Sequence, residues 1–307
     1  MSVVIVGSLA YDSVQSPAGQ VTDALGGSAT YGGLSCQFHL NQMNGQQAGL
    51  VGVVGTDFHP ADRAILVDAG LDDAGLMVAE GATFRWEGAY QGSMGEAETL
   101  ATHLNVFEHF QPEVPDHMRQ PAVLFCANLH PGIQQSVMEQ TEARRLTMLD
   151  SMNLWINIAR DELINVMKQA DLVIINDGEV RMLMNDENVV RAMQALADLI
   201  GCETLVVKRG EHGVLALHCG DLLALPAFPT ANLVDPTGCG DSFAGALAAH
   251  LAQSTEPLGL AELREGLMLA TVTASFTLER FGTEALQALT RTEFSKRYEA
   301  YQRMLMG

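Results

Sequence analysis

Short runs of apolar residues recur along most of this chain, and stretches with helical spacing separate most of them. Runs that are apolar on both faces are typical of strands buried between two layers of helices. The pattern therefore predicts an α/β fold with a mostly parallel sheet covered on both sides. The strand-like runs are 3–6, 50–54, 122–126, 146–149, 172–175 and 205–207. The main helical stretches between them are 29–39, 61–69, 133–140, 160–170 and 190–200.

Two regions break this rhythm, at about 12–23 and about 77–110. In the second, Thr83 to Tyr90 alternates like a half-exposed strand, so we expect a small sheet standing off the main one. The last third of the chain is mainly helical: 242–252, 260–280 with an interruption near Ala274, and 291–305. No repeat or linker divides the chain, so residues 1–307 are expected to form one domain.

Composition narrows the class of partner. Seventeen Lys and Arg face 37 Asp and Glu, giving a formal net charge of -20 that repels nucleic acid and anionic membranes. The five cysteines include no CxxC pair, which argues against a disulfide framework or a zinc site and favours a reducing cytoplasm. The N-terminus reads as a strand rather than a signal peptide, and no apolar run approaches the roughly 20 residues of a membrane span.

The segment Asp235-Pro-Thr-Gly-Cys-Gly-Asp241 has the pattern of an extended stretch, a glycine turn and the start of a helix. Glycines let successive backbone N–H groups point at one ligand, and the helix dipole adds to their attraction for an anion. Gly238, Cys239 and Gly240 are thus expected to hold a phosphoryl group, beside which Asp241 would act as a base. The alternative is that Asp241 only caps the helix.

Two strand ends carry further polar residues. Lys208, one of three lysines in the chain, is a scarce cation at the start of a flexible turn that contains Gly210 and Gly213; the alternative is an exposed hairpin lysine. Asn176 and Glu179 follow another strand, where ligands bind in open parallel sheets, and they suit a hydrated Mg²⁺. Their alternative role is a turn and helix cap.

Competing motifs are missing from the sequence. No lysine has the glycine spacing of a P-loop, and no G-x-G-x-x-G follows the first strand-like run. The nine histidines show no H-E-x-x-H spacing, so a histidine metal site is disfavoured.

Taken in chain order, six segments resemble the ribokinase (PfkB) carbohydrate kinase family, particularly a branch that includes nucleoside kinases: 6–12, 25–30, 52–57, 176–179, 208–213 and 235–241. The resemblance implies a three-layer α/β/α domain whose two irregular regions form a β-lid. It also implies that ATP binds near Asn176, Lys208, Gly210, Gly213 and Thr237, that Mg²⁺ is held through Asn176 and Glu179 largely by water, and that Asp235 contributes to a site for a monovalent cation such as K⁺.

On the acceptor side, the resemblance assigns Asp12 and the glycine pair Gly26 and Gly27 to substrate binding. The sugar kinases typically have asparagine where this chain has Tyr31, and the aromatic ring would either stack on a base or pack under the lid. The lid segment resembles that of nucleoside kinases, which adds Arg85 and Asn105 to the expected acceptor residues.

The leading hypothesis is therefore an ATP-dependent kinase that phosphorylates a hydroxymethyl group of a sugar or nucleoside. A non-catalytic nucleotide or sugar sensor with the same fold is the main alternative, and a dehydrogenase with an irregular glycine loop is a weaker one. Neither a nucleic acid nor a membrane is expected as a partner. A lid edge can pair with another chain to give a homodimer, but nothing in the sequence requires it.

Overall fold

The computed structural model describes residues 1–42, 45–92, 94, 95 and 97–306. Within them, nine strands form one sheet in the order β13-β12-β11-β10-β9-β8-β1-β4-β5. Pairing is parallel from β11 to β5, and β12 and β13 are antiparallel. The predicted mostly parallel sheet is confirmed. Its strands are β1 (Val3–Val6), β4 (Ala48–Gly55), β5 (Asp72–Ala79), β8 (Val123–Cys126), β9 (Leu146–Asp150), β10 (Leu172–Asn176), β11 (Thr204–Lys208), β12 (Val214–His218) and β13 (Asp221–Leu225).

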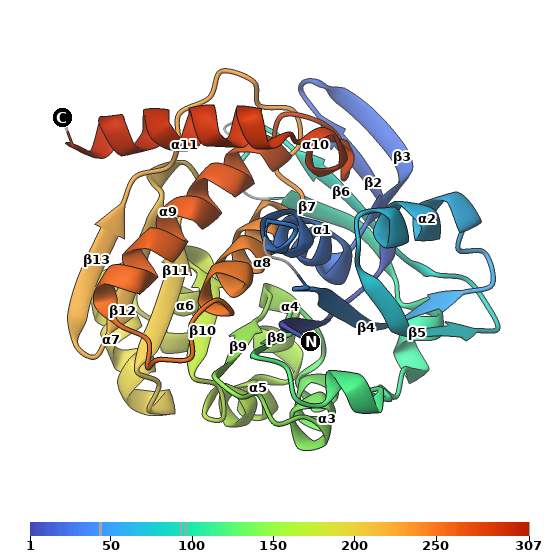
Figure 1. Ribbon diagram of the computed structural model, residues 1–307, viewed down its shortest axis with the longest axis horizontal. Helices are drawn as coiled ribbons and strands as arrows, with labels where there is room; N and C mark the ends of the chain where they lie inside the picture. Colours follow the sequence, from blue (N-terminus) through green and yellow to red (C-terminus); the bar gives the residue numbers. More distant parts are fainter. Residues whose placement is uncertain (43–44, 93, 96, 307) are drawn as a thin grey trace.

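Helices cover both faces of this sheet, because alternate strand residues point to opposite sides. In β1, Val3 and Ile5 join a core with α1, α8 and α9, whereas Val4 and Val6 join a core on the other face. Figure 1 shows α8 in the centre of its layer, between α1 and α9. The helices are α1 (Ser28–Leu40), α2 (Pro60–Asp68), α3 (Pro131–Gln140), α4 (Asn153–Ile158), α5 (Arg160–Met167), α6 (Asp177–Met184), α7 (Val189–Ile200), α8 (Cys239–Leu251), α9 (Leu260–Thr277), α10 (Glu284–Ala288) and α11 (Arg291–Met306).

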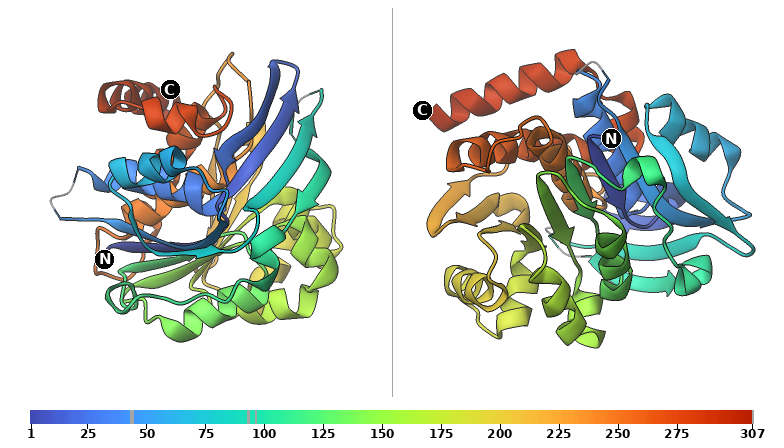
Figure 2. Two further views of the ribbon diagram at one scale, coloured as in Figure 1. Left: turned by 90° about the vertical axis from the view of Figure 1, so that its right-hand side faces the viewer. Right: turned by 60° about the horizontal axis from the view of Figure 1, so that its bottom comes forward.

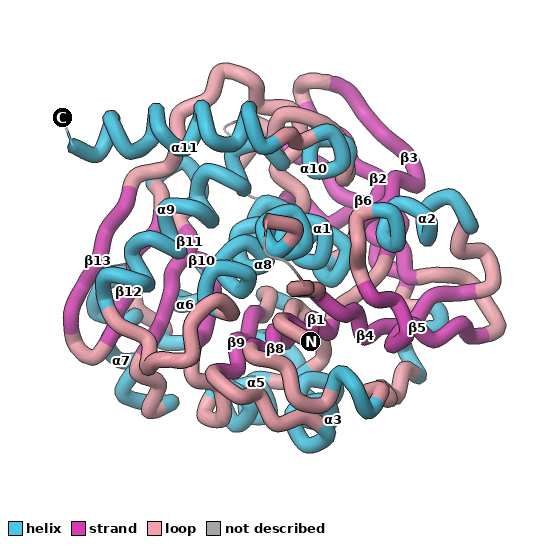
Figure 3. Tube along the Cα trace, viewed as in Figure 1, coloured by secondary structure: helices cyan, strands magenta, loops and turns pink. Residues whose placement is uncertain are grey.

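A second, smaller sheet has the strand order β3-β2-β6-β7. Its strands are β2 (Ala10–Ser16), β3 (Gly19–Gly26), β6 (Phe84–Tyr90) and β7 (Ala97–His103). β2 and β6 pair in parallel, and each has an antiparallel outer neighbour. Figure 2 shows these strands rising beside the main domain, and in Figure 3 they lie on the side away from β11 to β13.

The structure differs from the expected boundaries in three places. Residues 77–79 end β5 of the main sheet, where the second irregular region was expected to begin. Residues 105–109 form a 3₁₀ helix whose Phe107 packs into the main core, so the small sheet ends at His103. The helix α9 runs through Ala274 without interruption, because small and apolar residues on nearly all its sides fit between α8 and α11.

Candidate active site

Three adjacent parallel strands end in polar side chains at one edge of the main sheet. β9 ends at Asp150, β10 at Asn176 and β11 at Lys208. Asn176 is paired with Lys208, and Asp150 is paired with Ile174 two residues before Asn176. Open α/β sheets bind ligands outside the carboxyl ends of their strands, so this edge is the expected place for a site.

The glycine turn before α8 presents the start of that helix without a side-chain cap. Gly238 is the N-cap, with φ of 74°, and no side chain bonds the first turn there. A β carbon on Gly238 would overlap the Tyr31 ring, so only glycine fits. The Asp235 carboxylate fixes the turn by accepting from the N–H of Thr237 at 2.9 Å and of Gly282 at 3.2 Å. The first N–H groups of α8 have no partner within the helix and can bind an anion.

Asp241 lies inside the first turn of α8, which begins at Cys239 rather than at Asp241 as expected. Because Gly238 takes the N-cap position, the cap alternative for Asp241 does not apply. Burial and the Asp150 charge raise the pKa of Asp241 to about 7, while Lys208 opposes the rise. A carboxylate with a pKa near the working pH suits a general base.

Lys208 forms a buried ion pair beside this turn. Its Nζ lies 2.6 Å from Oδ2 of Asp150, and its side chain is 18% exposed, so the exposed-hairpin alternative is wrong. A β carbon on Gly240 would lie 3.0 Å from that Nζ, which places the ammonium against the first turn of α8. Burial lowers the pKa of Lys208, but Asp150 and Glu179 outweigh it and raise the pKa above its ordinary value. The lysine is therefore charged at neutral pH.

Asn176 and Glu179 form a capping box at the start of α6. Oδ1 of Asn176 accepts from the N–H of Glu179 at 2.8 Å, and the Glu179 carboxylate accepts from the backbone and side-chain nitrogens of Asn176. The cap that sequence could not exclude is thus present. Burial, followed by the charge of Asp150, raises the pKa of Glu179 to about 8. A cation bound nearby would favour the charged forms of these buried carboxylates.

Asp12 lies on the small sheet and faces the glycine pair. It is 4% exposed, accepts from the N–H of Gly27, and rests against Gly26, where any β carbon would overlap its carboxylate. Burial raises the pKa of Asp12 to about 7, and the charges of Asp235 and Asp241 add to the rise. The structure therefore brings Asp12 close to the phosphate-side residues Asp235 and Asp241.

Tyr31 packs beneath the glycine turn formed by residues 235–241, which we call the phosphate-side turn. It does not lie where its ring could stack on a base. It is 1% exposed, its ring contacts Gly238, and its hydroxyl has no hydrogen-bond partner among the described residues. Burial raises the pKa of Tyr31, with Asp12 as the next cause. Of the two roles expected for this aromatic residue, packing is the one observed. Burial likewise raises the pKa of the Cys239 thiol, which stays neutral.

Arg85 and Asn105 lie at the base of the small sheet rather than beside Asp12. Arg85 is paired with Tyr11, the neighbour of Asp12, and therefore points to the opposite face of the sheet. It bonds Asp57 at 2.9 Å and the carbonyl of Thr83 at 3.2 Å. Asn105 donates to the same carbonyl at 2.9 Å. These contacts tie the small sheet to the main domain and do not bring Arg85 to the acceptor side.

Two aromatic residues on the Asp12 face were missed. Trp86 is paired with Asp12 in the register, and the Tyr90 hydroxyl lies 3.2 Å from that of Thr237 in the phosphate-side turn. The alternation from Thr83 to Tyr90 showed that Trp86 and Tyr90 share a face. Only the pairing of β2 with β6 shows that Asp12 shares it too.

The remaining nucleotide-side glycines have different surroundings. Gly213 has φ of 85°, and a β carbon there would overlap the carbonyl of Leu225, so this glycine is required by the turn itself. Gly210 has φ of 50° and open space around its Cα. Gly210 is therefore the one of the two at which a ligand has room to approach.

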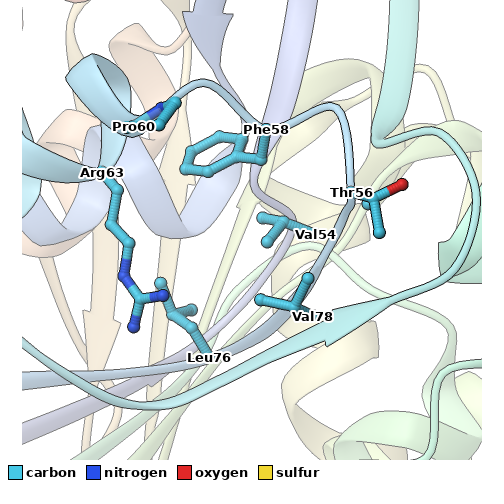
Figure 4. Close-up of a pocket in the computed structure, with 8 residues that line it drawn as sticks. Val54, Thr56, Phe58, Pro60, Arg63, Leu76 and Val78 are labelled. Atoms are coloured by element: carbon cyan, nitrogen blue, oxygen red, sulfur yellow. The ribbon is translucent and has the colours of Figure 1, made fainter.

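A pocket of about 280 Å³ lies elsewhere, between α2 and β5. It is lined by Val54, Gly55, Thr56, Phe58, Pro60, Arg63, Leu76 and Val78, and Figure 4 shows its mostly apolar side chains. None of the expected site residues lines it, so the chemistry and this cavity are separate. Within the described ranges, no His, Cys, Asp and Glu side chains form a group of three arranged to hold a metal ion. No helix in the described part of the chain has the length and apolarity to span a membrane.

Comparison with known proteins decides the family. The model of the pfkB family carbohydrate kinase matches residues 1–289. The chain belongs to this family. A cytidine kinase of Thermococcus kodakarensis is 27% identical over 278 residues, which cover 87% of this chain and 96% of that protein. The pfkB chain is therefore a phosphotransferase of the carbohydrate and nucleoside kinase type, which removes the sensor and dehydrogenase alternatives.

Solved structures confirm the fold. A nucleoside kinase of Burkholderia thailandensis in complex with inosine has a TM-score of 0.77 at 19% identity and covers 97% of each chain. The aminoimidazole riboside kinase of Salmonella enterica, complexed with aminoimidazole riboside and an ATP analog, has a TM-score of 0.73 at 19% identity, covering 97% of this chain and all of that one. At this identity the likeness shows the ribokinase fold and leaves the substrate open.

Proposed function

We propose that this kinase transfers the γ-phosphoryl group of ATP to a hydroxymethyl group of a nucleoside. The observation that carries the proposal is the uncapped first turn of α8, with Asp241 inside it and the Lys208 ammonium beside it. Asp12 lies on the facing sheet, close enough to Asp241 for the charge of Asp241 to add to the rise in the pKa of Asp12. An anion site, a base and an acceptor carboxylate thus converge.

The chemistry follows from these positions. The acceptor hydroxyl loses its proton to the Asp241 carboxylate as its oxygen bonds to the γ-phosphorus, and the bond from that phosphorus to the bridging oxygen of ADP breaks. Charge on the transferred group is met by the N–H groups of 238–241 and by Lys208. Gly210 leaves room for the nucleotide at the end of β11, while Asn176 and Thr237 border the same site.

Metal ions belong to the same proposal. Glu179 and Asn176 would hold hydrated Mg²⁺ through water, because the capping box already occupies their direct contacts. Bound there, the ion would neutralise phosphate charge. Asp235 uses both carboxylate oxygens to fix its turn, and it would contribute to a K⁺ site through its remaining lone pairs.

The lid sheet, β3-β2-β6-β7, supports a nucleoside rather than a simple sugar. The Trp86 ring lies against Gly88, where a β carbon would overlap the indole, and its Nε1 donates to Thr99 at 3.3 Å. The side chain is partly exposed and shares the face of Asp12. An indole held in this way offers a planar surface for a nucleobase, and the cytidine kinase relative supports the same acceptor class.

Replacing Trp86 with leucine tests this assignment. Stacking of a base on an aromatic ring is worth about 1–3 kcal/mol, so KM for nucleosides should rise about 5- to 150-fold while KM for ATP stays unchanged. In a Trp155→Phe background Trp86 is the only tryptophan, and nucleoside binding should quench its fluorescence. Equal KM values in wild type and Trp86→Leu, with no quenching, would contradict a base-stacking role.

The acceptor itself is tested by measuring ADP release with a panel of nucleosides and free sugars. The proposal predicts turnover with at least one nucleoside and higher kcat/KM for it than for ribose or fructose. Turnover confined to free sugars would support the kinase activity but contradict a nucleoside as the acceptor. A cytoplasmic location and a homodimer through the edge strands β3 or β7 stay predictions.

A further inference from the structure

The ion pair between Lys208 and Asp150 crosses a strand of the main sheet. Lys208 ends β11 and Asp150 ends β9, with β10 between them. Asp150 is 3% exposed, and its Oδ1 accepts from the N–H of Ser151 at 2.8 Å, which fixes the carboxylate. Its Oδ2 accepts from Nζ of Lys208 at 2.6 Å. The Lys208 side chain therefore extends across the end of β10 to a carboxylate that is held in place.

This partner decides where the ammonium lies. A lysine side chain has many rotamers, and fixing one geometry is costly unless a specific contact holds it. The contact with Asp150 holds Nζ against Gly240, in the first turn of α8. An ammonium has three donors, and Asp150 uses one of them, which leaves the others for an anion bound at that turn.

We propose that Asp150 is a positioning residue for phosphoryl transfer, which holds the Lys208 ammonium at the anion-binding turn of α8. The inference rests on the proposed function and adds a residue that the phosphate-side motifs do not contain. Lys208 meets the charge that develops on the transferred phosphoryl group. Asp150 acts through Lys208 and does not touch the substrate.

The kinetic test uses Asp150→Asn, Lys208→Met and the double variant. Removing one stabilising donor from such a site typically lowers kcat by about 10²–10³-fold. Each single variant should lose about 100-fold in kcat with KM for the acceptor nearly unchanged. The double variant should lose no more than the worse single variant, because both remove the same interaction.

Glu262→Gln is the matched control. Glu262 pairs with Arg145 at 2.7 Å in another shielded ion pair, and Arg145 precedes β9 at the end opposite Asp150. This variant should lower the melting temperature without lowering kcat. A kcat for Asp150→Asn within twofold of wild type, or losses that multiply in the double variant, would overturn the inference.

A second readout does not depend on turnover. The chain has three lysines, and Lys168 and Lys296 are exposed, so lysine labelled with ¹³C at Cε and ¹⁵N at Nζ gives one distinct NMR signal for Lys208. In wild type this signal should shift when the non-hydrolysable analogue AMP-PNP is added with Mg²⁺. In folded Asp150→Asn it should move towards the exposed lysines and respond little.

The kinetic test and the NMR signal distinguish failure of the proposed function from failure of Asp150 as a positioning residue. If wild type phosphorylates no acceptor but the Lys208 signal responds to AMP-PNP only when Asp150 is present, the proposed function fails and the positioning of Lys208 stands. A Lys208 signal that ignores AMP-PNP, or that responds equally in Asp150→Asn, contradicts the positioning even if the enzyme is active.

Discussion

Asp241, which we propose as the catalytic base, also has a cost in stability. Its pKa is raised from 3.8 to about 7 by burial and by Asp150, so ionising it costs more in the folded state than in the unfolded chain. The contribution of Asp241 to the free energy of unfolding is therefore most favourable below pH 3.8, the ordinary pKa of the group. It decreases as the pH rises from 3.8 to about 7. The site keeps a charge that the fold would be more stable without.

Asp241→Asn is accordingly expected to lose activity and gain stability. Removing a general base lowers kcat by about 10²–10⁴-fold. At pH 8 the melting temperature should rise by about 2–4 °C, because the cost of the buried carboxylate is gone. At pH 4 wild type is protonated too, and the difference should vanish. Thermal melts at both pH values check this; a variant less stable than wild type at pH 8 would contradict the account of the Asp241 pKa.

The pH dependence of the reaction follows from two carboxylates. The pKa values of Asp12 and Asp241 are both about 7, and both groups would act as carboxylates. Lowering the pH protonates them, so kcat/KM should fall on the acid side of about pH 7, with a limb steeper than one proton. The pH profile of kcat/KM measures this directly. A profile flat down to pH 5 would show that neither pKa is raised in the free enzyme.

At the scale of elements, a polar contact between Tyr90 of β6 and Thr237 joins the lid sheet to the phosphate-side turn. Tyr90 also packs with Val14 of β2 and with Phe281, which lies in the loop before α10. This apolar contact joins the lid sheet to that loop. A lid closed in this way excludes water that would otherwise accept the phosphoryl group.

Tyr90→Phe should therefore weaken the coupling of transfer to the acceptor. We expect kcat to fall by about tenfold and the ratio of ADP formed to acceptor phosphorylated to rise above one, because water enters an incompletely closed site. Tyr298→Phe, on α11, is the control and should leave the ratio at one. If Tyr90→Phe keeps the wild-type ratio and kcat, the contact is not a closure device.

Elements were predictable from sequence where their signal is local. The strands β1, β4 and β8 to β11 are continuous apolar runs, and the glycine turn before α8 is visible as Gly238-Cys-Gly240. The position of Arg85 was not, because the face that a strand residue occupies depends on the partner strand and its register. The pairing of Asp150 with Lys208 was not predictable for a related reason, since the two residues are 58 positions apart in the chain.

At the scale of the whole molecule, the net charge of -20 acts against compactness. Salt screens repulsion among exposed charges, with a Debye length of about 10 Å at 0.1 M and about 3 Å at 1 M. The melting temperature should therefore rise by several degrees between low and molar NaCl. An uncharged osmolyte at equal osmolality serves as the control. A melting temperature that falls with added NaCl would show that attractive ion pairs, not net repulsion, dominate the surface.

The fold brings residues from widely separated parts of the chain to one place, with Asp12 on the lid sheet, Lys208 on the main sheet and Asp241 on α8. We propose that this arrangement transfers a phosphoryl group with Asp241 as the base. The most direct test supplies ATP labelled with ³²P at the γ position and a panel of nucleosides, and follows the label. The account predicts a labelled nucleoside monophosphate with wild type and at least a hundredfold less with Asp241→Asn. Labelled product formed equally fast by both proteins would contradict it.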